Sequence, residues 1–253
     1  MILIFKQKFF IIFKIIINFL IPRFKNFKEA KNFSKKELKS DYNNSYLNSY
    51  RREKLEIFKH LIAKKSKNKF KNLDLAIKIF IKRYKRFPKV LDFGGGYGEI
   101  YYYLNKKYKN KIKISICETK YVKKDKLKNK SIIFFDNLNL AINSFKPDIV
   151  YSNAAFNFLE NPLFYLRILI KKKIKIISFS RIMVGEEYFS IQASLLSENG
   201  FPKTLFGKYR EKIIFYPFQN INKKKFINCL NKNYNLIKNY TNKNKLEIIG
   251  IIH

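Results

Sequence analysis

The sequence predicts an α/β fold: a doubly wound, mostly parallel sheet with an antiparallel pair of strands at its C-terminal end, preceded by N-terminal helices. Three observations lead to this prediction. Short apolar segments alternate with helical stretches through the middle of the chain. The first such segment runs directly into an acid and a glycine-rich turn, Asp92 to Gly98, with a helix expected to begin near Tyr97. Two further apolar segments close the chain.

The predicted strands are placed by their apolar runs and by the polar residue that ends each run. Because parallel strands share a direction, those polar residues are expected at one edge of the sheet, where ligands bind in this class of fold. A helix at 221–232 precedes the C-terminal pair of strands, and helices at 45–65 and 73–87 precede the sheet. The strands are expected at 89–92, 111–117, 132–135, 148–153, 173–181, 234–240 and 246–252.

A chain of 253 residues is long enough to bury one good core. We therefore expect one main domain over residues 39–253, in which the helical segment 39–87 caps the ligand site. Residues 1–38 are expected to form an apolar and basic helix followed by a linker.

The turn after the first strand combines an acid with closely spaced glycines. Glycines are needed where the backbone must approach a bound nucleotide-like ligand, because a Cβ there blocks the approach. The dinucleotide pattern G-x-G-x-x-G fails here, since its third glycine position holds Glu99, and no Gly-Lys-Ser/Thr follows as in a phosphate-binding P-loop. The residues of the turn predicted to bind a ligand are Asp92, Gly94, Gly95, Gly96 and Gly98.

This turn resembles motif I of the class I S-adenosylmethionine-dependent methyltransferases, whose sheet is Rossmann-like. The resemblance implies S-adenosylmethionine as the cofactor. An acid such as Asp92 then holds the cationic amino-acid end of the cofactor through charge-assisted hydrogen bonds. Glu118 ends the second strand, and an acid there is expected to accept hydrogen bonds from both ribose hydroxyls. Asp136, after the third strand, is expected on the adenine side, and Ser152, in the fourth, completes the predicted cofactor-binding set.

A narrower resemblance, to a bacterial methyltransferase family of surface-polysaccharide loci, covers residues 40–253. It implies methyl transfer to a small-molecule or glycan acceptor. The chain departs from the family where Asn157 and Phe158 replace Gln and Tyr, and where Ser180 replaces an acid. If these side chains contact the acceptor, the departures alter the substrate or abolish activity. The similar segments are Val90–Gly98, Phe134–Leu138, Ser152–Pro162 and Ser180–Arg181.

Polar residues near the carboxyl ends of the strands are the candidates for handling the acceptor. Asn153 and Asn157 are candidates to orient it, and Arg181 is a candidate to hold an acidic or phosphorylated group on it. If the acceptor is a hydroxyl, Glu186 or its neighbour Glu187 is a candidate to take the proton. The sequence singles out none of these as the catalytic residue.

The formal net charge of +36 invites a nucleic-acid or membrane partner. However, only eight of the 54 cations are Arg, the residue that nucleic-acid readers favour for bidentate contacts. A nucleic-acid methyltransferase stays open as an alternative, although the segment Asn153-Ala154-Ala155-Phe156 lacks the two prolines of adenine methylases. A non-catalytic protein that binds the cofactor or docks on a membrane is a second alternative.

The few cysteines and histidines limit the chemistry. Cys117 and Cys229 share no metal-like spacing and suit a reducing cytoplasm. His60 and His253 are the two histidines, too few for a histidine-based metal centre. We therefore expect a cytoplasmic protein without a metal site.

Residues 2–21 are apolar apart from a few polar positions, and Pro22 ends the run. At about 100° per residue, Gln7, Lys14 and Asn18 fall on one narrow face of a helix. We expect this helix to lie on an anionic membrane surface, with its apolar face buried, its lysines toward the headgroups and cations up to residue 28 adding attraction. A packing helix and a membrane-spanning helix stay open as alternatives.

Overall fold

The computed structural model describes residues 2–40, 44–65, 69–120, 122, 131–199, 209–242 and 244–253. The chain divides into two compact units, each of which is assembled from two stretches of sequence. The N-terminal unit consists of Met1–Phe58 and Glu187–Asn220. The sheet unit consists of Lys59–Glu186 and Ile221–His253.

The sheet unit has a Rossmann-like sheet in the order β3-β2-β1-β4-β5-β9-β8, which confirms the predicted fold class. The first five of these strands run parallel, whereas β9 is antiparallel to both β5 and β8. The carboxyl ends of the parallel strands therefore meet at one edge of the sheet, as the sequence predicted. The strands are β1 (Lys89–Phe93), β2 (Lys113–Cys117), β3 (Ile133–Phe135), β4 (Ile149–Asn153), β5 (Ile176–Gly185), β8 (Tyr234–Asn242) and β9 (Lys245–Ile252).

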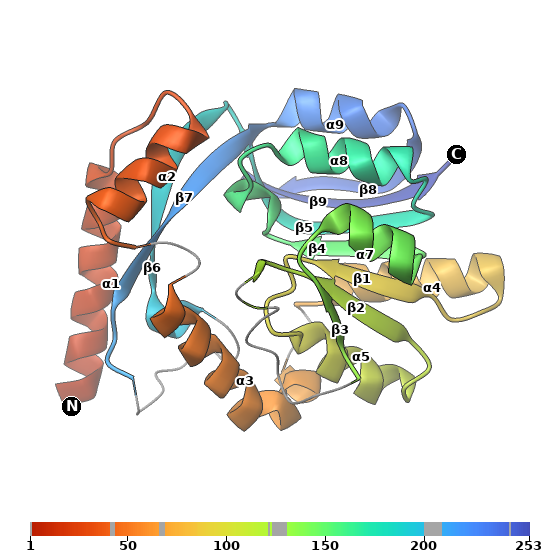
Figure 1. Cartoon of the computed structure of the whole chain (residues 1–253), viewed down its shortest axis with the longest axis horizontal. Helices are drawn as coiled ribbons and strands as arrows, with labels where there is room; N and C mark the ends of the chain where they lie inside the picture. Colours follow the sequence, from red (N-terminus) through yellow and green to blue (C-terminus); the bar gives the residue numbers. More distant parts are fainter. Residues whose placement is uncertain are drawn as a thin grey trace. The chain divides into compact units, whose positions relative to one another are not determined.

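Helices cover both faces of this sheet. Figure 1 shows α7, α8 and α9 on one face, and α4 and α5 on the other. On the first face a core of aromatic rings joins the layers: Phe156 lies 4.9 Å from Phe179 and 5.5 Å from Phe226 between ring centroids. The helices are α4 (Lys71–Tyr84), α5 (Glu99–Tyr108), α7 (Leu138–Phe145), α8 (Pro162–Lys171) and α9 (Lys223–Asn231).

Two predicted boundaries differ from the structure for local reasons. The helix expected near Tyr97 begins at Glu99, because Gly98 precedes it with a left-handed φ of +91° and ends the turn. The fifth strand, expected to end at residue 181, continues to Gly185, because its last two residues pair with the end of β7 (Ile213–Asn222).

The N-terminal unit joins the start of the chain to a hairpin that the sequence did not predict. It contains α1 (Ile2–Leu20), α2 (Phe27–Lys36) and the first part of α3 (Ser45–Lys65). β6 (Tyr188–Leu195) pairs antiparallel with β7, and both α1 and α2 pack against β6. No helix within the described ranges combines the length and hydropathy needed to cross a bilayer.

Candidate functional site

The candidate site begins at the glycine turn between β1 and α5, in the sheet unit. Gly94, Gly96 and Gly98 have φ angles of +75°, +58° and +91°, which favour glycine over any other residue. The Gly94 N–H donates to the carbonyl of Cys117 at 2.9 Å, which ties the turn to the end of β2. A Cβ added at Gly94 would lie 2.2 Å from the Cβ of Ala155. The turn is therefore locked between two strand ends and tolerates no side chain at Gly94.

The Asp92 carboxyl lies beneath this turn and is almost fully buried, with 4% of the residue exposed. No hydrogen bond reaches it from the described residues, and a Cβ at Gly95 would lie 2.3 Å from its Oδ2 atom. Burial raises the pKa of Asp92 to about 8; Lys69 opposes this rise and Glu118 adds to it. A buried acid with so perturbed a pKa, and with no hydrogen-bond donor among the described residues, is typical of a ligand site.

Glu118 lies at the end of β2, directly beside the turn. Its Oε1 atom accepts a hydrogen bond from the Gly96 N–H at 3.0 Å, and its Oε2 atom accepts one from the Thr119 N–H at 2.7 Å. Each carboxylate oxygen can accept a second hydrogen bond. The Glu118 carboxylate therefore holds the turn in place and keeps acceptor capacity for a ligand.

The other two predicted cofactor residues lie at the same edge. Burial raises the pKa of the Cys117 thiol to about 12, and both Glu118 and Asp136 add to the rise, so these acids lie near the end of β2. The Ser152 hydroxyl donates to the carbonyl of Phe93 at 2.9 Å and is fully buried. This bond joins the ends of β1 and β4, and contact of Ser152 with a cofactor stays a prediction.

A second group of polar residues lies at the ends of β4 and β5. The Nε of Arg181 donates to the Oδ1 of Asn153 at 2.6 Å, which brings two of the predicted acceptor residues together. Ala154 and Arg181 both have left-handed φ angles, +66° and +57°, which are uncommon outside glycine. The Ala154 N–H donates to the Ser180 carbonyl at 2.8 Å across the two strands. Strained backbone of this kind clusters at functional sites.

Glu247, on β9, supports this group from the side. Its Oε1 accepts from the Arg181 N–H at 3.1 Å, and its Oε2 accepts from the Asn72 side chain. The Asn72 amide also donates to the Ser180 hydroxyl at 3.0 Å and accepts from the Lys238 ammonium. Arg181 thus lies in a bulge of β5 and is held by a hydrogen-bond network that involves residues of α4, β5, β8 and β9.

Tyr151 lies between the two groups. It pairs with Asp92 in the register of β1 and β4, and its side chain is almost fully buried. Burial raises the pKa of Tyr151 well above its usual value; Asp92 adds to the rise, Arg181 opposes it and Glu247 adds to it. Charges from both groups therefore act on one hydroxyl, so the two groups lie at neighbouring strand ends on the carboxyl edge of the sheet.

The remaining predicted acceptor residues take different positions. The Asn157 amide donates to the Met183 carbonyl at 2.8 Å and accepts from the Met183 N–H at 2.9 Å, so it completes the edge of β5 as a backbone group would. Asn157 is 1% exposed, and its predicted contact with an acceptor stays a prediction. Ser180, where the resembled family has an acid, accepts from Asn72. Glu186 lies exposed in the turn after β5.

Sequence reasoning missed four residues of the site: Lys69, Asn72, Lys238 and Glu247. The pairing of β9 with β5 brings Glu247 to Arg181 from 66 residues away, which local patterns do not reveal. One signal was present, because Glu247 is an acid inside an otherwise apolar predicted strand.

The hydrogen-bond acceptors of the site, Asp92 and Glu118, fit a ligand that carries both a cationic group and neighbouring hydroxyls. Asp92 offers a buried carboxyl group to which no described residue donates a hydrogen bond, and its ionised form suits an ammonium group. Glu118 offers two acceptor oxygens close by, which suits a pair of hydroxyls. The acids around the turn do not suit a phosphate, which prefers cations and free backbone N–H groups.

No protein-family model matches the chain, and no curated protein matches its sequence. Solved structures do match its fold. Streptomyces venezuelae DesVI has a TM-score of 0.51 and 8% identity, over 79% of this chain and 98% of that chain. A S-adenosylmethionine-dependent methyltransferase from Clostridium acetobutylicum has a TM-score of 0.49 and 13% identity, over 78% and 96%. The glycopeptide N-methyltransferase MtfA, complexed with S-adenosyl-L-homocysteine, has a TM-score of 0.42 and 10% identity, over 70% and 88%. The likeness to DesVI agrees with the Rossmann-like sheet and extends to the fold alone.

Proposed function

We propose that this protein is an enzyme that transfers a methyl group from S-adenosylmethionine to a small-molecule or glycan acceptor. The observation that carries the proposal is the pair of buried acids, Asp92 and Glu118, on either side of a glycine turn at the carboxyl edge of a Rossmann-like sheet. This arrangement supports the resemblance to motif I, and these acceptor groups match the ammonium and hydroxyl groups of that cofactor.

Each acid has a separate role in the proposal. Asp92 holds the ammonium group of the cofactor, Glu118 accepts from its ribose hydroxyls, and Asp136 lies toward its adenine. When bound, S-adenosylmethionine supplies a methyl group on a sulfonium that is open to in-line displacement. The protein's task is then to align the acceptor and to exclude water.

Arg181 and Asn153 are the proposed acceptor contacts. The Nε of Arg181 is engaged by Asn153, which fixes the guanidinium plane and leaves its two terminal nitrogens to hold an acidic or phosphorylated acceptor. Glu247, which receives the Arg181 N–H, is the proposed proton acceptor if the acceptor is a hydroxyl. The resemblance to a family of surface-polysaccharide loci makes a glycan precursor the acceptor we favour.

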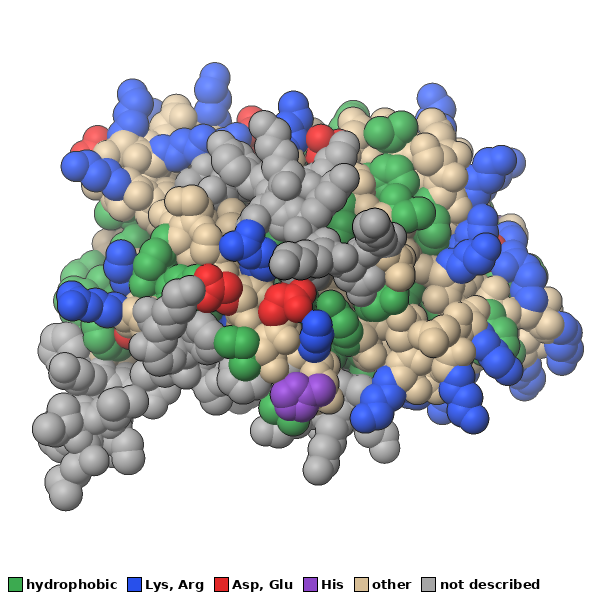
Figure 2. Space-filling model, turned by 60° about the horizontal axis from the view of Figure 1, so that its bottom comes forward, with side chains coloured by type: hydrophobic (Ala, Val, Ile, Leu, Met, Phe, Trp, Pro, Cys, Tyr) green, Lys and Arg blue, Asp and Glu red, His purple; other side chains and the backbone are tan. Residues whose placement is uncertain are grey.

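The geometry favours this proposal over methylation of nucleic acid. In that alternative the Asn153 side chain holds a flipped base, but here its oxygen already accepts from Arg181. On the face drawn in Figure 2, Lys and Arg side chains are scattered among other residue types rather than gathered in one stripe. We also propose that the enzyme lies in the cytoplasm, which its free cysteines Cys117 and Cys229 suit. We propose that it lies there at the inner face of a membrane, because residues 11–20 of α1 present apolar side chains outward.

Calorimetric binding to the full chain tests the proposal. We expect S-adenosylmethionine and S-adenosylhomocysteine to bind with dissociation constants on the order of micromolar. Asp92→Ala and Glu118→Ala should each weaken binding at least about tenfold, because each removes a charge-assisted contact. Glu37→Ala is the matched control, since it removes one exposed acid from the N-terminal unit and should leave binding unchanged. A folded wild type that binds neither compound would contradict the proposal, and a steeply salt-dependent affinity for RNA would favour the alternative.

A further inference from the structure

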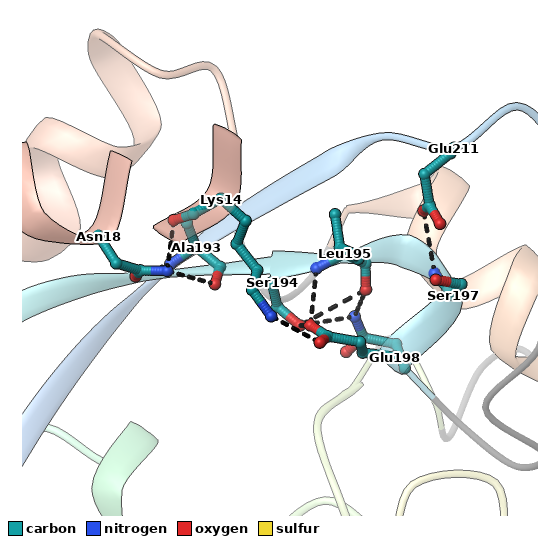
Figure 3. A network of polar contacts seen from close by, with 9 residues as sticks. Lys14, Asn18, Ala193, Ser194, Leu195, Ser197, Glu198 and Glu211 are labelled. Atoms are coloured by element: carbon teal, nitrogen blue, oxygen red, sulfur yellow. Dashed lines mark hydrogen bonds and ion pairs between the residues drawn. The ribbon is translucent and has the colours of Figure 1, made fainter. Parts of the chain in front are cut away.

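The first helix is turned so that two of its polar side chains, Lys14 and Asn18, face the N-terminal unit. The Lys14 ammonium pairs with the Glu198 Oε1 atom at 2.6 Å. The Asn18 amide donates to the Ala193 carbonyl at 3.2 Å and accepts from the Ala193 N–H at 3.0 Å. Figure 3 shows these contacts of α1 with β6 and with the 3-10 turn Leu196–Glu198 that follows it. The sequence led us to expect Lys14 among lipid headgroups; that expectation is wrong, because Glu198, in the short 3-10 turn that follows β6, is its partner.

The Glu198 carboxylate, which pairs with Lys14, is held in place by hydrogen bonds from its own segment of the chain. The Oε2 atom of Glu198 accepts from the Leu195 N–H at 3.0 Å and from the Ser194 hydroxyl at 3.3 Å, as Figure 3 also shows. Although partial burial raises it, the pKa of Glu198 is lowered overall, chiefly by the hydrogen bond from Lys14. A carboxylate fixed by hydrogen bonds from the end of β6 holds Lys14 in one position, so α1 is anchored at Lys14 and Asn18.

Between residues 11 and 20, the opposite side of α1 is exposed and entirely apolar. At about 100° per residue, the exposed apolar positions cover more than half of the helix circumference. The two polar residues between positions 11 and 20, Lys14 and Asn18, lie on the other side of the helix. Phe19 is 88% exposed and Leu20 is 70% exposed. Soluble proteins rarely leave such a contiguous apolar face uncovered. We call these seven residues the outward face: Ile11, Ile12, Phe13, Ile15, Ile16, Phe19 and Leu20.

We propose that the outward face docks on an anionic lipid bilayer, with the N-terminal unit as a preformed platform. The helix is held by its polar anchor, so its apolar side chains enter the boundary between headgroups and acyl chains without a prior folding step. The exposed cations Arg23, Lys25 and Lys28 follow the helix directly and supply attraction to anionic headgroups, each by about fivefold in affinity.

Charge favours a bilayer over a second copy of this chain as the occupant. Two copies each carry a formal net charge of +36, so their approach is opposed by like-charge repulsion. An anionic surface turns the same charge into attraction. The proposal does not depend on methyl transfer, because the outward face lies in the N-terminal unit and the glycine turn lies in the sheet unit.

A flotation assay with vesicles tests the docking. The full chain should bind vesicles of phosphatidylcholine mixed with phosphatidylglycerol, and bind phosphatidylcholine alone much more weakly. The variant Ile12→Gln/Ile16→Gln/Phe19→Gln should lose on the order of a hundredfold in binding. The matched control changes three exposed apolar residues of the sheet unit, Leu140→Gln/Phe164→Gln/Ile237→Gln, and should bind as the wild type does. Equal loss in both variants, or no loss in either, overturns the proposal.

A fluorescence measurement avoids dependence on disruptive variants. The chain contains no Trp, so Phe19→Trp introduces a single reporter at the most exposed residue of the outward face. Its emission should shift to shorter wavelength when anionic vesicles are added, whereas Phe164→Trp, on the sheet unit, should not shift. Absence of a shift at Phe19→Trp overturns the proposal. So does a vesicle-free dimer that the triple outward-face variant dissociates, because a second copy is then the occupant.

Discussion

Two aspartates of the sheet unit are buried to nearly the same degree, but their pKa values are shifted in opposite directions. Asp148, just before β4, is 5% exposed and accepts hydrogen bonds from Arg86 at 2.6 and 2.8 Å, from Lys175 at 2.8 Å and from the Lys89 N–H at 3.0 Å. These bonds outweigh its burial and lower its pKa to about 2. Asp92, near the far end of β1, is 4% exposed, and burial raises its pKa to about 8.

This difference in hydrogen-bond partners distinguishes a structural aspartate from a ligand-binding candidate on the same sheet. At the amino edge the protein itself supplies every charge that Asp148 needs, so the carboxylate is a structural tie between strands and helix. At the carboxyl edge no hydrogen bond from the described residues reaches Asp92, which costs free energy unless a ligand completes the site. An incomplete buried acid beside a glycine turn therefore marks where the ligand binds.

The largest expected effect comes from filling the turn that covers Asp92. Gly94→Ala places a Cβ 2.2 Å from that of Ala155 at a φ of +75°. We expect the free energy of unfolding to fall by about 3 kcal/mol and cofactor binding to be lost, as chemical denaturation and calorimetry would measure. Adding Ala155→Gly should recover the part of the loss due to the clash but not the part due to φ. A single variant as stable as wild type would contradict the locked turn.

Removing each aspartate's charge sharpens the comparison, because the expected changes in stability have opposite signs. Asp148 has a lowered pKa, so its ionised form contributes stability above pH about 3.8, and this contribution is lost as the pH falls through about 2. Asp148→Asn should therefore lower the free energy of unfolding by about 2 kcal/mol at neutral pH. Asp92 has a raised pKa, so its contribution is lost as the pH rises from about 3.8 through about 8. Asp92→Asn should therefore stabilise the ligand-free protein above pH about 8.

Denaturant unfolding of both variants at several pH values checks this pair. The wild type serves as the reference at each pH, and circular dichroism confirms that both variants fold. Destabilisation by Asp92→Asn at every pH would show that its carboxylate has structural partners like those of Asp148, and the comparison would fail.

The smallest expected change in stability comes from Glu118→Gln, which tests the role of Glu118 separately from that of Asp92. Glu118→Gln keeps a neutral acceptor for the Gly96 N–H, so the free energy of unfolding should change by only about 0.5 kcal/mol. Cofactor affinity should fall on the order of tenfold, because a carboxylate accepts from two hydroxyls more strongly than an amide does. Calorimetry on the folded variant measures the loss, and unchanged affinity would remove Glu118 from the proposed site.

The sheet and the glycine turn were predictable because their signals are local. The apolar run ending at Asp92, the glycines after it and the helix that follows occupy one short stretch of sequence. The hairpin of β6 and β7 gave a weaker signal, because a proline such as Pro217 argues against a strand. In the structure Pro217 nevertheless lies within β7, opposite Ile191 of β6. The strand boundaries near Gly185 were missed because that pairing is with a distant segment.

The parts of the site that sequence reasoning missed depend on distant pairing. Glu247 reaches Arg181 only because β9 inserts antiparallel beside β5. The predicted orientation of α1 was wrong for the same reason. Lys14 and Asn18 lie on one side of the helix, as the pattern predicted, but their partners, Glu198 and Ala193, lie more than 170 residues away. Periodicity shows which side of a helix is polar, and only the tertiary structure shows what that side contacts.

The affinity of the full chain for S-adenosylmethionine, measured against pH for wild type and Asp92→Asn, tests the central claim most directly. The cofactor's own amino group titrates in both experiments, so the ratio of the two affinities isolates Asp92. We predict that the ratio in favour of wild type rises between about pH 6 and about pH 8 and then levels off, because binding the ammonium requires the ionised carboxylate. A ratio that stays near one at every pH would contradict the claim that Asp92 is the buried acid left for the ligand.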